Sequence, residues 1–241
     1  MDLSRVAKRG RSAASDGSED GDGNTHGDGD ENRDGNRNEN GDGDGNGGTE
    51  REDTPAEDGV RDAAVLAPVI DRAGTDHVMF TKRAEHLTDH PGQMSFPGGG
   101  REPEDVDLLA TALREANEEV GLEPAEADVV GHLTDIRTVT NYRVRPFVGR
   151  VPDREYVPRD SEVAEIAVLP VAGLVDPANY ESERRDHPHY GEIRLHFFHV
   201  DGYTVWGATA NMLVQLLEWT TDWTCPPEPD RTVDADADLP G

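Results

Sequence analysis

The sequence predicts an α+β sandwich, in which helices pack on the faces of a mixed β-sheet. Several short apolar runs, one of them with alternating apolar and polar residues, are typical of strands. Two longer segments, 106–120 and 208–220, carry apolar residues at the i, i+3 and i+4 spacing of a helix. Each such helix must bury one apolar stripe, and a sheet offers an apolar face that can cover it. The 241 residues suffice for one domain of about 150–170 residues with a tail at each end.

The predicted strands all follow residue 62, and from Val65 the composition becomes typical of a globular domain. Pro170 should end one of them, because proline cannot donate to a strand ladder. The closing helix should bury the side that carries Met212, Leu213, Leu216 and Leu217. The strands are expected at residues 63–70, 77–82, 129–134, 144–151, 163–169 and 193–200.

Three regions follow from the composition along the chain. Residues 1–60 consist mainly of Asp, Gly, Asn and Glu, and a segment with so few apolar residues cannot offset its ordering entropy. We therefore expect an acidic disordered tail at 1–60, a folded domain at 61–224 and a flexible acidic tail at 225–241.

The net charge of −28 limits the kinds of partner that the protein can have. A surface this acidic argues against binding to nucleic acid. Lys8 and Lys82 are the only lysines, and an acidic, lysine-poor chain suits a cytosol of molar salt, where repulsion between charges is screened over a few ångströms.

Cys225 is the only cysteine, so an internal disulfide and a thiolate cluster are both excluded. No apolar run approaches about 18 residues and no secretory signal is evident, so we expect a soluble cytoplasmic protein without membrane partners. The oligomeric state stays open, with a homodimer as one alternative.

The segment 98–122 carries the strongest functional signal. A run of glycines, Gly98 to Gly100, precedes the predicted helix 106–120. We expect Asp105 to be the N-cap of this helix and Gly121 to end it in the left-handed conformation.

Three carboxylates share one face of that helix. Glu115, Glu118 and Glu119 are related by i, i+3 and i+4, so their like charges repel until a cation binds. Mg²⁺ fits this set, because it prefers carboxylate oxygens and is commonly completed by substrate phosphates. The alternative is a solvated acidic helix face, which does not account for the glycines, the buried stripe and Arg114 together.

Residues 114–122 resemble the second half of the Nudix box, G-x5-E-x7-R-E-U-x-E-E-x-G-U, with Ala116 in place of the bulky aliphatic residue U. The first half departs from this pattern. Counted from Gly100, the acidic position is Val106; counted from Gly99, it is Asp105, with one extra residue before Arg114. We assign the acidic position to Asp105. The resemblance implies the α/β/α Nudix fold and a hydrolase that depends on Mg²⁺ or Mn²⁺.

Residues 79–84 and 92–99 resemble the upstream signature of the coenzyme A pyrophosphatases, L-L-T-x-R-[SA]-x3-R-x3-G-x3-F-P-G-G. Thr88 stands where the second arginine is expected. The regions around Glu162 and Trp206 also resemble this subfamily, and the resemblance covers about residues 62–220. Trp206 itself is interpreted as core packing in preference to a stacking platform. His86 and His90 precede the glycines and could contact substrate, although a structural or surface role is favoured.

The resemblance implies a role for each residue of the site. Glu115, Glu118 and Glu119 hold the metal, and one of them, or Glu162, deprotonates the attacking water. Arg114 orients a glutamate through a charge-assisted bond. The residues expected to contact substrate are Arg83, Gly98 and Gly99.

The expected reaction is cleavage of the pyrophosphate of coenzyme A or acyl-CoA into 3′,5′-ADP and a 4′-phosphopantetheine product. Two alternatives stay open. The first is a Nudix hydrolase of another small nucleotide-type substrate, namely ADP-ribose, a dinucleotide or an oxidised nucleotide. The second is a nucleotide-sensing Nudix domain without turnover, against which the intact Arg114 and glutamates count.

Overall fold

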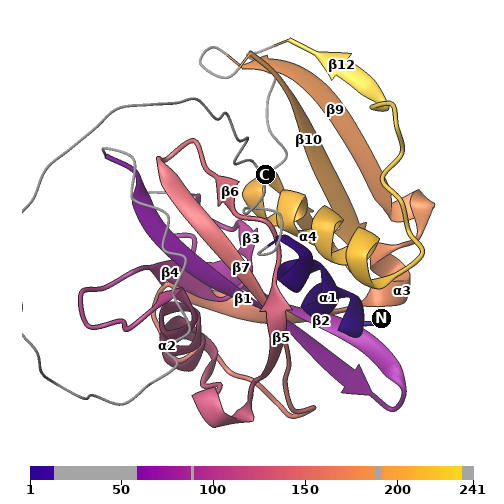
Figure 1. Ribbon diagram of the computed structural model, residues 1–241. Coiled ribbons are helices and arrows are strands. Elements are labelled where there is room, and N and C mark those ends of the chain that lie inside the picture. Colours follow the sequence, from indigo (N-terminus) through magenta and orange to yellow (C-terminus); the bar gives the residue numbers. More distant parts are fainter. Residues whose placement is uncertain (14–58, 88–89, 188–190, 235–241) are drawn as a thin grey trace, which may run out of the picture.

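A computed structural model of the chain describes residues 1–13, 59–87, 90–187 and 191–234 (Figure 1). These residues form two sheets and helices on both faces of the larger sheet. None of the described helices is long and apolar enough to cross a membrane. The helices are α1 (Ser4–Ala13), α2 (Leu108–Val120), α3 (Val171–Leu174) and α4 (Gly207–Thr220).

The larger sheet is mixed and contains eight strands in the order β3-β2-β1-β7-β5, with β4 paired to β1, β6 to β7 and β8 to β2. β1 and β7 run parallel at its centre, and the other pairs are antiparallel. Its strands are β1 (Arg61–Arg72), β2 (Thr75–Arg83), β3 (Met94–Ser95), β4 (Gly98–Gly100), β5 (Asp128–His132), β6 (Ile136–Arg137), β7 (Tyr142–Arg150) and β8 (Val163–Pro170).

The smaller sheet has the order β11-β10-β9-β12 and lies beside α4. Its strands are β9 (Tyr180–His187), β10 (Gly191–Val200), β11 (Tyr203–Trp206) and β12 (Arg231–Val233). All six predicted strands and both predicted helices are present, and the α+β class is confirmed. The other strands were not predicted: β3, β4 and β6 in the larger sheet and β9, β11 and β12 in the smaller one.

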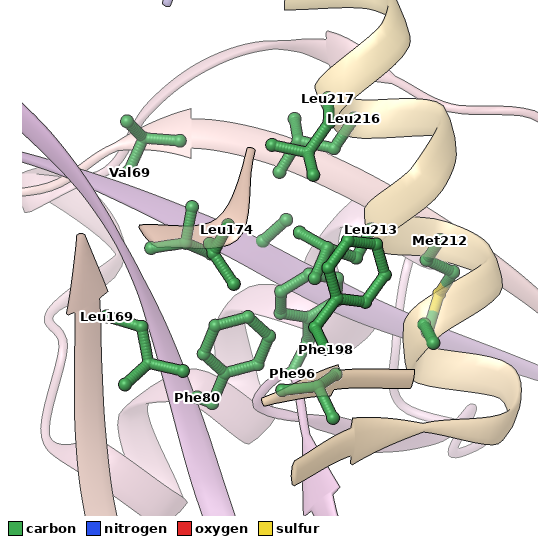
Figure 2. Close-up of a cluster of buried hydrophobic side chains, with 14 of the residues drawn as sticks. Val69, Phe80, Phe96, Leu169, Leu174, Phe198, Met212, Leu213, Leu216 and Leu217 are labelled. Atoms are coloured by element: carbon green, nitrogen blue, oxygen red, sulfur yellow. The ribbon is translucent and has the colours of Figure 1, made fainter. Parts of the chain in front are cut away.

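Each face of the larger sheet is covered by a different helix (Figure 1). On one face, α2 buries Leu108, Ala112 and Ala116 against sheet residues such as Leu66 and Ile70. On the other face, α4 contributes the predicted apolar side, which meets Phe80, Phe96 and Phe198 in a larger cluster (Figure 2). We call these the α2 face and the α4 face.

The expectation of a disordered N-terminal tail is wrong for residues 1–13. They include α1, whose Val6 is fully buried and whose contacts are with β5 and α4. The Asp2 amide donates to the Thr220 carbonyl at 2.7 Å, and Arg9 lies 5.0 Å from the centre of the Trp219 ring. A few apolar residues suffice here, because α4 and β5 supply the rest of the apolar surface. The remainder of the predicted tail, residues 14–58, lies outside the described part of the chain.

The C-terminal tail also departs from its prediction. Residues 225–234 lead into the smaller sheet, where β12 pairs with β9 in parallel. The Asp230 carboxylate accepts the Ser182 amide hydrogen at 2.7 Å, and Arg231 forms ion pairs with Glu181 and Glu183. These polar contacts order a segment that has little apolar content of its own. Residues 235–241 lie outside the described part.

Candidate active site

The glycine run forms β4, which pairs with β1 and passes directly over α2. A Cβ atom at Gly98 would overlap the Ala64 carbonyl and Val65, and one at Gly99 would overlap the Glu115 carboxylate. Gly98 is therefore required by the close approach of the β1 backbone, whereas a side chain at Gly99 would displace the Glu115 carboxylate from its present place. Together the two glycines bring a helix carboxylate against the backbone of the strand.

Helix α2 begins two residues later than expected. Its N-cap is Asp107, whose carboxylate accepts the Ala110 amide hydrogen at 2.8 Å, so the assignment of Asp105 as N-cap is wrong. Gly121 ends the helix at φ 68°, as expected. Val106, the position that the Nudix pattern counted from Gly100 would make acidic, is 67% exposed.

Asp105 instead binds Arg114 from the loop before the helix. Its two carboxylate oxygens accept from the Arg114 guanidinium at 3.0 and 3.1 Å, and the Thr111 hydroxyl donates to it at 2.9 Å. Arg114 holds the pKa of the buried Asp105 carboxyl down at about 2. An aspartate one position before Val106 thus provides the carboxylate partner of Arg114.

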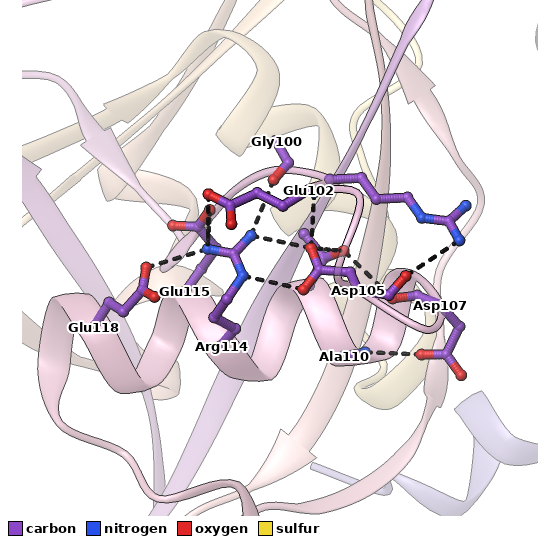
Figure 3. Close-up of polar contacts among 10 residues, drawn as sticks. Gly100, Glu102, Asp105, Asp107, Ala110, Arg114, Glu115 and Glu118 are labelled. Atoms are coloured by element: carbon purple, nitrogen blue, oxygen red, sulfur yellow. Dashed lines mark hydrogen bonds and ion pairs between the residues drawn. The ribbon is translucent and has the colours of Figure 1, made fainter.

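Arg114 joins this loop, β4 and the acidic helix face (Figure 3). It donates to the Gly100 carbonyl at 3.1 Å, to Glu115 at 3.0 Å and to Glu118 at 3.1 Å. Glu102 lies 3.8 Å away as a further anionic neighbour. These anions raise the pKa of Arg114 above its usual value, so its positive charge is permanent.

Glu119 is the most perturbed carboxyl of the site. Burial raises its pKa to about 8, and the charge of Glu115 adds to this effect, whereas Arg83 opposes it. Its Oε2 accepts the Gly98 amide hydrogen at 3.3 Å. Burial also raises the pKa of Glu115, although Arg114 lowers it in part. A cation bound between these groups would remove the cost of ionising both.

Arg83 and Glu162 lie together at the ends of β2 and β8. Their side chains approach to 3.7 Å, and the Ala84 amide donates to the Glu162 carbonyl at 2.8 Å. Arg83 acts on the pKa of Glu119, so this pair is electrostatically coupled to the helix face. Glu162 is about half exposed, which leaves its carboxylate accessible to water.

The structure thus brings together the predicted residues Gly98, Gly99, Arg114, Glu115, Glu118 and Glu119, with Arg83 and Glu162 beside them. The carboxylate oxygens of the glutamates are the ligands that Mg²⁺ and Mn²⁺ prefer, so these side chains fit a divalent metal in chemical type. Within the described residues, however, no group of three such side chains is gathered as a metal would gather it. Arg114 holds Glu115 and Glu118, while Glu119 is bonded to β4.

The sequence analysis missed two acidic partners of Arg114. Asp105 was expected to cap the helix and to be the acidic residue of the motif, but its bond to Arg114 was not predicted, and Glu102 was not selected at all. Thr111, which lies one helical turn before the glutamates and bonds Asp105, was the signal that could have revealed the Asp105 role.

Comparison with known proteins supports a family assignment. A family model described as the NUDIX domain matches residues 60–190. A protein named uncharacterized Nudix hydrolase NudL from Enterobacter sp. (strain 638) is 38% identical over 160 residues, which cover 65% of this chain and 81% of that protein. The NudL protein of Cronobacter sakazakii (strain ATCC BAA-894) is 39% identical with the same coverage. A crystal structure of a C. elegans Ap4A hydrolase binary complex has a TM-score of 0.41 and 17% identity, covering 47% of this chain and 82% of that chain, a similarity too weak to support any functional assignment.

Proposed function

The chain belongs to the Nudix family of hydrolases, and on that premise we propose that it cleaves the diphosphate of coenzyme A or acyl-CoA. The products are 3′,5′-ADP and a 4′-phosphopantetheine compound. The family acts on small nucleotide-type substrates with divalent metal ions. The choice of Mg²⁺ or Mn²⁺, and of coenzyme A among such substrates, is the proposed part. The observation that carries the hydrolytic part is the pair of partly buried carboxylates, Glu115 and Glu119, held against β4.

Glu115, Glu118 and Glu119 are the proposed metal ligands. A bound divalent ion would neutralise the diphosphate and acidify a water molecule. Arg114 keeps Glu115 and Glu118 at fixed places on the helix, and the Gly98 amide orients Glu119. The backbone of Gly98 and Gly99 carries no side chain that would exclude a phosphate from this surface.

Glu162 is the proposed general base outside the metal face. Its half-exposed carboxylate can take a proton from water, and the Arg83 guanidinium 3.7 Å away can turn to a phosphate oxygen. One of the three helix glutamates is the alternative base. Glu162→Gln separates the two: a loss of about 10²-fold in kcat without a change in metal affinity supports Glu162 as the base.

Support for coenzyme A comes from residues 79–99, whose pattern resembles the coenzyme A pyrophosphatase signature. In the structure this segment includes the end of β2, β3 and the first residues of β4, so it carries Arg83 and both glycines of the site. The acidic composition further supports a protein that works in a cytoplasm of concentrated salt.

A substrate panel tests the proposal. Coenzyme A, 3′-dephospho-coenzyme A and ADP-ribose are compared in molar KCl with Mg²⁺ and with Mn²⁺. We expect kcat/KM to be highest for coenzyme A and lowest for ADP-ribose. A tenfold advantage for ADP-ribose, about 1.4 kcal/mol of transition-state discrimination, would replace coenzyme A by a general Nudix substrate. Absence of turnover on a wide panel would favour a nucleotide sensor.

A further inference from the structure

A cavity of about 370 Å³ lies at the C-terminal end of β2, on the α4 face of the larger sheet. Lys82 and Trp206 are among its lining residues. Its volume is at the small end of the ~300–1,000 Å³ typical of small-molecule sites, so it suits one part of a larger substrate.

The cavity and the candidate active site share one strand end but lie on opposite faces. Side chains alternate along a strand. Val78 and Phe80 belong to the apolar cluster of the α4 face and Met79 to that of the α2 face, so Lys82 is directed to the cavity and Arg83 to the α2 face.

Backbone hydrogen bonds join the two sites. The Arg83 amide donates to the Gln93 carbonyl at 3.0 Å, and the Gly92 amide donates to the Arg83 carbonyl at 3.1 Å. Gln93 and Gly92 both line the cavity. A substrate that lies across this strand end would therefore contact the cavity and the Arg83–Glu162 pair together.

Lys82 is the cation of this cavity. It is one of two lysines in the whole chain, and no ion pair joins it to a carboxylate among the residues that the structure describes. Its cross-strand neighbour Glu165 is bonded by the Tyr203 hydroxyl, and Glu85 is the carboxylate among the lining residues. Two arginines elsewhere in the larger sheet are already engaged: Arg143 pairs with Asp62 at 2.9 Å and Arg145 with Asp135 at 2.8 Å.

Three further lining groups complement this ammonium group. The His90 imidazole and the Gln93 side-chain amide are additional hydrogen-bond donors at the same cavity. The Trp206 ring is half-buried and belongs to neither apolar cluster, so the interpretation of Trp206 as core packing is not supported. An aromatic ring beside cationic and polar donors suits a heteroaromatic base that carries a phosphate.

We propose that this cavity binds the phosphorylated nucleoside end of the substrate, with the base on Trp206 and a phosphomonoester on Lys82. The proposal rests on the proposed function, because it names the site that would read the 3′-phosphate of coenzyme A. Lys82 then determines specificity and takes no part in bond cleavage.

The chain permits a direct binding test, because Lys8 on α1 is an internal reference for Lys82. Full-length protein without added metal is acylated with an amine-reactive ester in molar KCl, and the two lysines are followed by mass spectrometry. We expect saturating 3′,5′-ADP to slow acylation of Lys82 at least tenfold and to leave Lys8 unchanged. Weaker protection by 5′-AMP should show that the 3′-phosphate is read.

Three results of this test would overturn the proposal. The first is equal acylation of Lys82 with and without 3′,5′-ADP. The second is protection by pantetheine that matches or exceeds protection by 3′,5′-ADP, which would assign the cavity to the other end of the substrate. Inorganic phosphate is tested alone as well. If it protects Lys82 as strongly as 3′,5′-ADP does, the cavity binds an anion but not a base, and the proposal is overturned.

Variants separate this inference from the proposed function. Lys82→Met should reduce the kcat/KM ratio of coenzyme A to 3′-dephospho-coenzyme A at least tenfold through KM, with Lys8→Met as the matched control. An unchanged ratio in an enzyme that cleaves coenzyme A would refute the inference and leave the function standing. The opposite combination is also distinguishable. If 3′,5′-ADP protects Lys82 in the wild type but not in Trp206→Leu, the binding site is supported. If the same wild-type protein does not cleave coenzyme A, the proposed function is refuted.

Discussion

The two faces of the larger sheet differ in what their helices bring to it. On the α2 face, a single amphipathic helix buries a small cluster and turns a row of charged side chains toward β4. On the α4 face, α4 and α1 bury a larger cluster that continues into the smaller sheet. The contrast places the proposed chemistry where the covering layer is thin, while much of the stability is expected from the thick layer.

Glu119→Gln should separate activity from stability on the α2 face. We expect kcat to fall by about 10²–10⁴-fold, because a proposed metal ligand or base is lost. The free energy of unfolding of the metal-free protein at pH 7 should stay the same or rise, because burial raises the pKa of Glu119 to about 8 and ionisation there is costly. Steady-state kinetics at saturating Mg²⁺ and urea unfolding give the two quantities.

Glu104→Gln, at an exposed position of the loop before α2, removes the same charge and should change neither quantity. Near-wild-type turnover of Glu119→Gln would remove Glu119 from the catalytic machinery.

Val6→Asp, on the α4 face, should have the opposite effect and reduce stability, in contrast to Glu119→Gln, which should reduce activity. Val6 is fully buried on α1, and a Cβ at Gly131 would lie only 3.3 Å from it, so there is no room for a hydrated carboxylate. We expect a loss of about 3–5 kcal/mol in unfolding free energy, as for other unpaired buried charges. Ser4→Asp, at an exposed position of the same helix, is the control. Equal urea midpoints for Val6→Asp and wild type would show that α1 is not part of the stable core.

Asp105→Asn tests the link between loop and helix on the α2 face. Because Arg114 lowers the pKa of Asp105 to about 2, the folded protein holds this carboxyl ionised more readily than the unfolded chain does. Its stabilisation of about 2 kcal/mol is present above about pH 4 and is lost as the pH falls toward 2. The difference in unfolding free energy between wild type and Asp105→Asn should therefore shrink across this range. A difference that is constant with pH would mean that charge is not its source.

Arg9→Met should give the smallest effect. Its guanidinium lies over Trp219 at an exposed position, and such contacts contribute about 0.5–1 kcal/mol. The thermal midpoint should fall slightly, with activity unchanged, and Arg9→Lys should recover part of the loss. A fall in kcat would instead couple α1 to the active site.

The central strands and both long helices could be predicted because their signals are local. The stripe of α2 and the left-handed Gly121 depend on residues within one or two helical turns. The same periodicity placed Glu115, Glu118 and Glu119 on one face. The start of α2 has no unique local signal, because Asp105 and Asp107 are both good N-caps by residue type. In the folded protein, Arg114 binds the Asp105 carboxylate, and Asp107 is the residue that caps the helix.

The sequence by itself therefore determined the acidic helix face, the run of glycines that precedes it and the family to which they belong. The tertiary structure alone decided that α1 docks through Val6, that β12 joins β9, and that Lys82 lines a cavity with Trp206. The physical reason is the range of the interactions. Helical periodicity acts over a few residues, whereas the partner that buries an isolated valine or pairs a three-residue strand lies far along the chain and has no local signature.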